Sequence, residues 1–167
     1  GANEWRGVGG PLNIADLRSP NPFQKIFIDA AQQAGITFNP DFNGSTQEGV
    51  GPYQVTQKNG ERFSAARAYL APARSRGNLQ VLTGARVTRV LFESARATGV
   101  EFTREGQTQV LRARREVIVA AGALQSPQLL MLSGVGPGAH LQAQGIRVVA
   151  DVPGVGRNLQ DHLDIIV

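Results

Sequence analysis

The amino-terminal third of the chain contains one clear helical pattern of apolar positions. Asn21 is a suitable N-cap, Pro22 suits the first helical turn, and Gly35 suits the left-handed position after a helix. Apolar residues recur between them at the spacing of one helix face: Phe23, Ile26, Phe27, Ala30, Ala31 and Ala34. This spacing predicts a helix over residues 22–34.

A tight turn and a short helix are expected next. Asn59-Gly60 favours a two-residue turn between extended segments, because both residues tolerate a positive φ. Ser64 is then placed to cap a helix over residues 65–70, which Pro72 would close.

Beyond residue 78 the pattern becomes extended. Residues 79–83 have the composition of a strand, and three further β-like runs follow at residues 86–92, 98–103 and 108–114. Short polar gaps separate the last three runs. Because a parallel return needs a longer crossover, these gaps predict a three-stranded antiparallel meander over about 86–114.

A second kind of strand is predicted at residues 117–121. This run is apolar without alternation, as expected of a strand covered on both faces. Ser126 and Pro127 suit the start of a following helix and Gly134 suits its end. Together these patterns predict an α/β fold.

Composition narrows the possible chemistry. The chain has no cysteine and two histidines, His140 and His162, so we expect no disulfide, no thiolate nucleophile and no metal site. No apolar run approaches the length that spans a bilayer. Residues 62–115 hold 11 arginines against 3 glutamates. This basic stretch leaves a nucleic-acid-binding domain as one alternative, although aromatic residues for base stacking are few.

The bend after the strand at 117–121 is the best candidate for ligand binding. At Ala121-Gly122-Ala123 no bulky side chain keeps a ligand away from the backbone. The N–H groups at the start of the next helix would favour phosphate. The bend can therefore line a dinucleotide, or it can be an ordinary strand-to-helix turn with small residues for packing.

Other motifs carry less weight. Gly134, Gly136 and Ala139 match a dinucleotide fingerprint in spacing, but that fingerprint requires a preceding strand and here a helix precedes it. The chain contains no Gly-x-Ser-x-Gly elbow and no phosphate loop with Gly-Lys-Ser/Thr.

The run Gly122–Gly136, GALQSPQLLMLSGVG, resembles the second signature of the glucose-methanol-choline (GMC) oxidoreductases, which are FAD-dependent enzymes that oxidise alcohols. Residues 78–84 resemble the family strand that precedes the adenine contact, and residues 156–162 its Asn-Leu-Gln-Asp-His element. Residues 41–44 and 62–70 resemble the choline dehydrogenase-like branch. The resemblance covers nearly the whole chain.

This resemblance implies an FAD site. The position of Val87 matches a valine whose main chain contacts the adenine of FAD, and Ala121, Gly122 and Ala123 match a turn near the cofactor. The resemblance also implies hydride transfer to FAD from a small primary alcohol, choline-like or aliphatic. The family's opening Gly-x-Gly-x-x-Gly turn and its catalytic histidine region have no counterpart in these residues. We therefore expect an internal fragment of an enzyme, inactive alone, with no catalytic residue of its own. A non-catalytic nucleotide-binding module is the other alternative.

The resemblance also divides the chain. It assigns residues 1–60 to the substrate-domain side and residues 61–167 to the FAD-binding domain with a crossover to the substrate domain. We expect His162 to be a structural hydrogen-bonding residue and His140 to be solvated on a surface helix. The expected location is the cytoplasm, with association with a membrane as the alternative.

Overall fold

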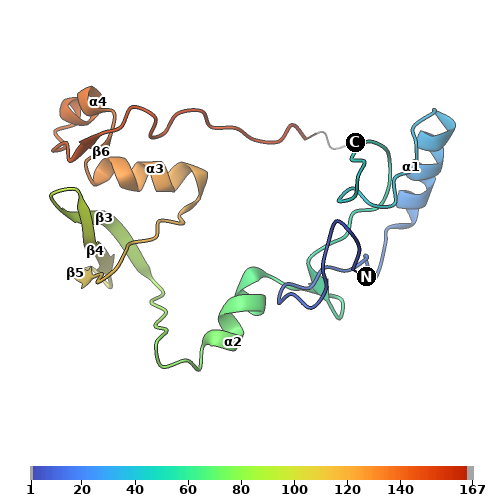
Figure 1. Cartoon of the computed structure of the whole chain (residues 1–167), viewed down its shortest axis with the longest axis horizontal. Coiled ribbons are helices and arrows are strands. Elements are labelled where there is room, and N and C mark those ends of the chain that lie inside the picture. Colours follow the sequence, from blue (N-terminus) through green and yellow to red (C-terminus); the bar gives the residue numbers. More distant parts are fainter. Residues whose placement is uncertain (1, 165–167) are drawn as a thin grey trace. The chain divides into compact units, whose positions relative to one another are not determined.

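The computed structural model describes residues 2–164 and divides the chain into two compact units, residues 1–81 and 82–167 (Figure 1). The first unit contains α1 (Pro22–Gln33), β1 (Gln57–Lys58), β2 (Glu61–Arg62), η1 (Ala66–Leu70) and α2 (Ala71–Ala73). The second unit contains β3 (Ala85–Glu93), β4 (Arg96–Arg104), β5 (Gln107–Arg112), α3 (Gly122–Leu132), β6 (Val135–Gly136), α4 (Gly138–Ala143) and β7 (Ala150–Asp151).

Helix α1 forms where the sequence predicts it. The Asn21 side chain accepts a hydrogen bond of 3.0 Å from the Phe23 N–H, and Pro22 occupies the first turn. Its predicted apolar face is exposed in this unit: Phe23, Ile26 and Phe27 are all more than half accessible.

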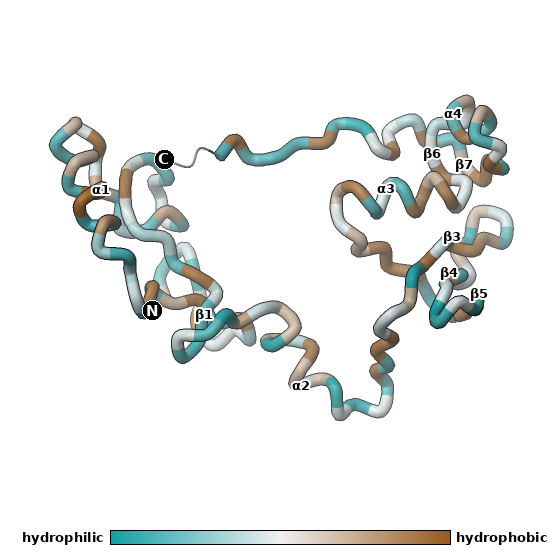
Figure 2. The backbone as a smooth tube through the Cα atoms, turned by 180° about the vertical axis from the view of Figure 1, so that it is seen from behind, coloured by the Kyte–Doolittle hydropathy of each residue, from teal (hydrophilic) through white to brown (hydrophobic). Residues whose placement is uncertain are grey.

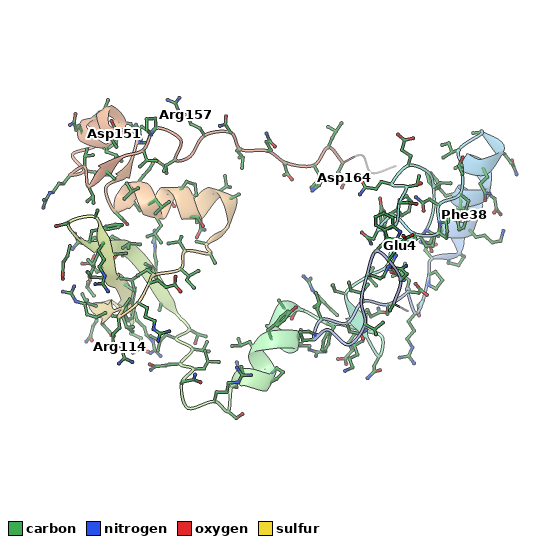
Figure 3. The ribbon with its side chains drawn as sticks, viewed as in Figure 1. Glu4, Phe38, Arg114, Asp151, Arg157 and Asp164 are labelled. Carbon is green, nitrogen blue, oxygen red and sulfur yellow. The ribbon has the colours of Figure 1, made fainter. Side chains whose placement is uncertain are left out.

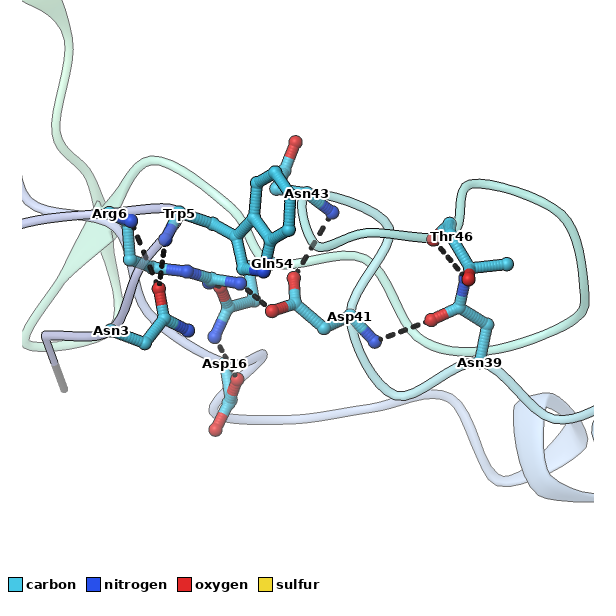
Figure 4. Close-up of polar contacts among 9 residues, drawn as sticks. All are labelled: Asn3, Trp5, Arg6, Asp16, Asn39, Asp41, Asn43, Thr46 and Gln54. Atoms are coloured by element: carbon cyan, nitrogen blue, oxygen red, sulfur yellow. Dashed lines mark hydrogen bonds and ion pairs between the residues drawn. The ribbon is translucent and has the colours of Figure 1, made fainter.

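Polar contacts organise the loop that follows α1 (Figure 4). The buried Asn39 amide donates to the carbonyl oxygens of Thr46 at 2.7 Å and Glu48 at 3.1 Å, so it closes the loop on itself. Asp41 forms an ion pair with Arg6, whose guanidinium also donates to Gln54 at 3.0 Å. These contacts join the start of the chain to residues 39–54.

The predicted turn at Asn59-Gly60 is confirmed, with φ values of 56° and 81°, and it joins β1 to β2. The expected end of the next helix is wrong. Ser64 does accept from the Arg67 N–H, at 3.4 Å, but Pro72 lies within the helical segment instead of closing it. Element η1 is a π-helix in which the Ala71 N–H reaches back to the Ala66 carbonyl, and this wider turn continues into α2.

The antiparallel meander is confirmed as the sheet β3-β4-β5. In Figure 2 its strands change repeatedly between hydrophilic and hydrophobic colour, as half-buried strands do. Val90 and Phe102 are each 4% exposed and form its packed centre, whereas every residue of β5 is exposed. The sheet therefore has β3 as one edge and a solvated β5 as the other.

Two predicted strands are not formed. Residues 79–83 and 117–121 have no strand structure, and Ile118 is 79% exposed. A strand is stabilised by its ladder of hydrogen bonds, and within residues 2–164 neither segment has a neighbouring strand to pair with. The apolar sequence of both segments therefore predicts buried strands. Residues 2–164 do not provide the neighbouring strands that would bury them.

The carboxyl-terminal part of the second unit is a compact turn-rich segment. Parallel strands β6 and β7 pair Val135 with Ala150, and Leu141 of α4 is fully buried. The Asp151 carboxylate accepts from the Gly138 N–H at 2.8 Å and so holds the start of α4; Figure 3 shows Asp151 beside this helix. No helix among the described residues is long and apolar enough to cross a bilayer.

Candidate functional site

Helix α3 begins earlier than its sequence suggests. It starts at Gly122 rather than at Ser126, and Pro127 lies inside it. The Ser126 hydroxyl accepts a hydrogen bond of 3.0 Å from the Ala121 N–H, so this serine satisfies the N-terminus from within the helix. The helix ends where predicted, and Gly134 follows it with a φ of 89°.

A buried hydroxyl fixes α3 against the edge of the sheet. Ser133 Oγ accepts from the Val90 N–H of β3 at 2.8 Å and donates to the Leu129 carbonyl at 2.6 Å. Because Ser133 is only 8% exposed, this link is shielded from water. It sets the separation between β3 and α3, which are the two walls of the site.

A groove of about 890 Å³ lies between these walls. Its residues come from β3, β4, the bend before α3 and α3 itself: Ala85, Arg86, Val87, Thr88, Thr103, Ala121, Gln125, Gln128, Leu129 and Leu132. This size is in the range of small-molecule and cofactor sites.

The groove brings together residues that the sequence places far apart. Val87 and Ala121, two of the four predicted site residues, line it from opposite walls. Gly122 and Ala123 follow Ala121 directly, and both are exposed at the start of α3. Gly122 has a φ of 85°, and a Cβ built there would meet nothing within 4 Å. The space that a side chain at residue 122 would fill is therefore empty of protein atoms.

Backbone donors are free at this bend. The first N–H groups of an α-helix have no acceptor within the helix. Ser126 satisfies Ala121, but no side chain caps the N–H groups of Gly122, Ala123 and Leu124 in the described residues. These donors favour an anionic group at the start of α3.

The β3 wall carries a bulge that sequence patterning did not reveal. Val87 pairs with Phe102 and Arg89 with Glu101, so Thr88 is an extra residue on β3. Thr88 Oγ1 donates to Glu101 Oε1 at 2.8 Å, and Arg89 donates to Glu101 Oε2 at 2.7 Å. Bulges redirect side chains near binding sites. A bulge in a nine-residue strand leaves no periodic signal that would identify it beforehand.

These two hydrogen bonds lead to a pH prediction. The bond from Arg89, followed by that from Thr88, lowers the pKa of Glu101 below its ordinary value. Because the folded pKa is the lower one, Glu101 stabilises the fold at pH values above the unfolded pKa of about 4.3, and this contribution is lost as the pH falls through the folded pKa. In an NMR titration of the Glu101 carboxyl, Arg89→Met should raise the midpoint towards the ordinary value. If the titration midpoint of Glu101 is unchanged in Arg89→Met, the hydrogen bond from Arg89 does not lower the pKa of Glu101.

The remaining candidate residues lie outside the groove. His140 is exposed on α4, as predicted. His162 is exposed, and within the described residues its ring has no hydrogen-bond partner, so the structure gives no support for a hydrogen-bonding role. No cluster of His, Asp and Glu that could hold a metal ion is found in residues 2–164.

Some of the arginines between residues 62 and 115 form local ion pairs. Arg67, Arg89, Arg104 and Arg112 form ion pairs with glutamates. Arg114 projects from the sheet region in Figure 3 without an ion-pair partner in the described part of the chain. Local ion pairs therefore involve four of the eleven arginines of this stretch.

A groove built from a sheet edge, a small-residue bend and a helix start has room for a small molecule or a cofactor. Residues 3–164 match the family described as GMC oxidoreductase, and the chain belongs to this family.

Relatives of known name support this placement. The chain is 50% identical over 164 residues to the oxygen-dependent choline dehydrogenase of Rhizobium johnstonii, and 50% identical over 165 residues to the alcohol dehydrogenase [acceptor] of Pseudomonas putida. Each match covers 98% of this chain and 30% of the relative. The chain therefore spans about 30% of the length of these relatives.

Solved structures agree. The crystal structure of pyridoxine 4-oxidase from Mesorbium loti matches 93% of this chain and 31% of its own, with a TM-score of 0.84 and 39% identity. An FAD-dependent oxidoreductase from Chaetomium thermophilum matches 93% of this chain and 28% of its own, with a TM-score of 0.87 and 32% identity.

Proposed function

We propose that this chain forms part of the FAD site of an enzyme that oxidises a small primary alcohol, choline-like or aliphatic. The observation that carries the proposal is the groove that Val87 and Ala121 line from opposite walls. Membership of the GMC oxidoreductase family supports the reaction class, and the names of the two curated relatives support the substrate class.

The residues of the groove fit this cofactor. Val87, Leu129 and Leu132 offer apolar surface to a flat ring, and the main chain of Val87 lies on an edge strand where a ligand can reach it. Ala121, Gly122 and Ala123 form the bend where the backbone allows close approach. The free N–H groups at the start of α3 would hold the phosphates of the dinucleotide. Arg86, exposed and without an ion-pair partner in the described residues, adds positive charge at the same groove.

The bound flavin would supply the hydride acceptor, while a base removes the hydroxyl proton of the alcohol. The residues that line the groove include no His, Asp, Glu, Lys or Tyr, so none of them is assigned this proton transfer. Their role is to bind and orient the cofactor. The electron acceptor that reoxidises the flavin is not assigned. The division at residue 60 and the cytoplasmic location remain predictions.

The test uses the complete protein encoded by the gene that carries this sequence. We expect it to purify with bound flavin, and we expect choline or a straight-chain primary alcohol to bleach the flavin absorption without oxygen. Bound flavin that no primary alcohol reduces would instead favour the non-catalytic nucleotide-binding module. Absence of flavin with salt-sensitive retention on DNA or RNA would favour the nucleic-acid-binding domain.

A further inference from the structure

The backbone of β3 at Val90 faces the end of helix α3 rather than β4. In an antiparallel pair, successive residues of a strand alternately exchange backbone hydrogen bonds with the neighbouring strand and face away from it. Val90 faces away, because its N–H donates to Ser133 Oγ at 2.8 Å. Since β3 is an edge of the sheet β3-β4-β5, this bond joins the outer side of the sheet to α3.

The bulge at Thr88 turns the main chain of Val87 to the same side. Val87 and Val90 are three residues apart, so regular alternation would turn the main chain of Val87 towards β4. The extra residue of the bulge shifts the alternation by one position, because the register changes between Val87 and Arg89. The main chain of Val87 therefore faces away from β4, on the side of β3 where Val90 meets α3.

The Ser133 hydroxyl is fully used by this link. It donates its one proton to the Leu129 carbonyl at 2.6 Å, and its oxygen accepts from the Val90 N–H. Ser133 is 8% exposed and Val90 is 4% exposed, so little water reaches the bond. Removing the hydroxyl would leave a buried N–H without an acceptor, which is costly. That cost is avoided only if β3 and α3 move apart until water reaches the N–H.

The residues joined by this link also form the walls of the groove. Val87 lines the groove from β3, and Leu129, whose carbonyl accepts the Ser133 proton, lines it from α3. A movement of β3 against α3 at Ser133 would therefore change the distance between the two walls. Because the Ser133 hydroxyl is buried and both of its hydrogen bonds go to the protein, Ser133 acts on a ligand through these walls.

We propose that Ser133 is a positioning residue for FAD, whose hydroxyl fixes the width of the groove before the cofactor binds. A preformed site loses less free energy to ordering when its ligand binds. By thermodynamic reciprocity, bound FAD stabilises the link between Ser133 and Val90 to the same extent. This inference rests on the proposed function, because it requires FAD to bind in this groove.

The first test measures the dissociation constant of FAD in variants of the complete apoprotein, by the change in flavin fluorescence. Ser133→Ala removes the acceptor of the Val90 N–H, and we expect the dissociation constant to rise about tenfold, within the range usual for coupled sites. The matched control, Asp151→Ala, removes the acceptor of the Gly138 N–H, which also lies at 2.8 Å and in the same unit. This control should keep the wild-type dissociation constant. Thermal unfolding checks that both variants are folded at the temperature of the binding measurement.

The second test needs no variant and remains decisive if Ser133→Ala does not fold. Amide hydrogen exchange is followed in the complete wild-type protein with and without FAD. The N–H groups of Val90 and Gly138 are matched probes, because each donates to a side-chain oxygen at 2.8 Å. Reciprocity predicts that FAD slows exchange about tenfold more at Val90 than at Gly138.

The outcomes separate this inference from the proposed function. If FAD binds wild-type protein and Ser133→Ala equally, or slows exchange equally at Val90 and Gly138, Ser133 does not position the cofactor, while the proposed function stands. If Ser133→Ala and Asp151→Ala weaken binding equally, the effect comes from general stability and the inference is overturned as well. If wild-type protein binds no FAD, the proposed function fails and this inference fails with it.

Discussion

Gly134→Ala is expected to destabilise the second unit by about 3 kcal/mol or more. The left-handed backbone at this residue, with φ of 89°, costs a non-glycine residue about 1–2 kcal/mol. The new Cβ would also overlap the Arg147 carbonyl oxygen and lie 2.9 Å from Val149 Cγ2. Relief of that overlap would disturb the bonds that Gly134 O accepts from Val149 at 2.8 Å and Ala150 at 3.1 Å, each contributing about 0.5–1.5 kcal/mol.

Amide hydrogen exchange at Val149 measures this effect locally, because its N–H makes one of the bonds at risk. The matched control is Gly145→Ala. Gly145 also has a positive φ, 69°, but a Cβ there would meet nothing within 4 Å. The control should therefore show only the backbone cost. If Gly134→Ala and Gly145→Ala lose equal stability, the contacts of the new Cβ with Arg147 and Val149 do not add to the destabilisation.

The elements predicted correctly from sequence depend on local chemistry. Asn21 and Pro22 determine where α1 begins, and Asn59-Gly60 determines a turn that only positive φ values allow. The short polar gaps between strands fix the β3-β4-β5 meander, because such gaps permit antiparallel pairing alone. Each of these signals acts over a few residues.

The errors have two sources: a missing neighbouring strand, and local helix geometry that residue preferences do not predict. The apolar run at residues 117–121 has the composition of a buried strand, but composition does not supply the neighbouring strand that a ladder needs. The sequence predicts Ser126 at the start of the helix because serine usually accepts from N–H groups that follow it, whereas here it accepts from the N–H of Ala121, which precedes it. Pro72 lies in the first turn of α2, a position that tolerates proline, and α2 directly follows the π-helix η1, for which single-residue propensities give no signal.

The sequence predicts the candidate site only in part, because some of its features have a local signal and others do not. Small residues at 121–123 identify a bend that a ligand can approach, and the family resemblance identifies Val87. The groove that joins these positions depends on the Ser133 bond to β3, and which α3 residues line it depends on where α3 begins. Neither feature has a signature within its own few residues.

Gly122→Ala is expected to weaken flavin binding about 100-fold in the complete protein. Under the proposed function the phosphates approach the N–H groups of the first turn of α3, and the new Cβ would stand in the space that is now open at φ of 85°. Displacing a charged ligand from even one such hydrogen bond costs about 1.5–3 kcal/mol, which corresponds to a factor of roughly 10–150 in the dissociation constant.

Binding is measured by the change in fluorescence when apoprotein takes up FAD. Gly145→Ala again serves as the control, because it carries a similar backbone cost but lies outside the groove. Both variants should lose about 1–2 kcal/mol of stability, yet only Gly122→Ala should lose flavin. If the two variants bind FAD equally well, the bend at 121–123 is not where the cofactor makes its close approach.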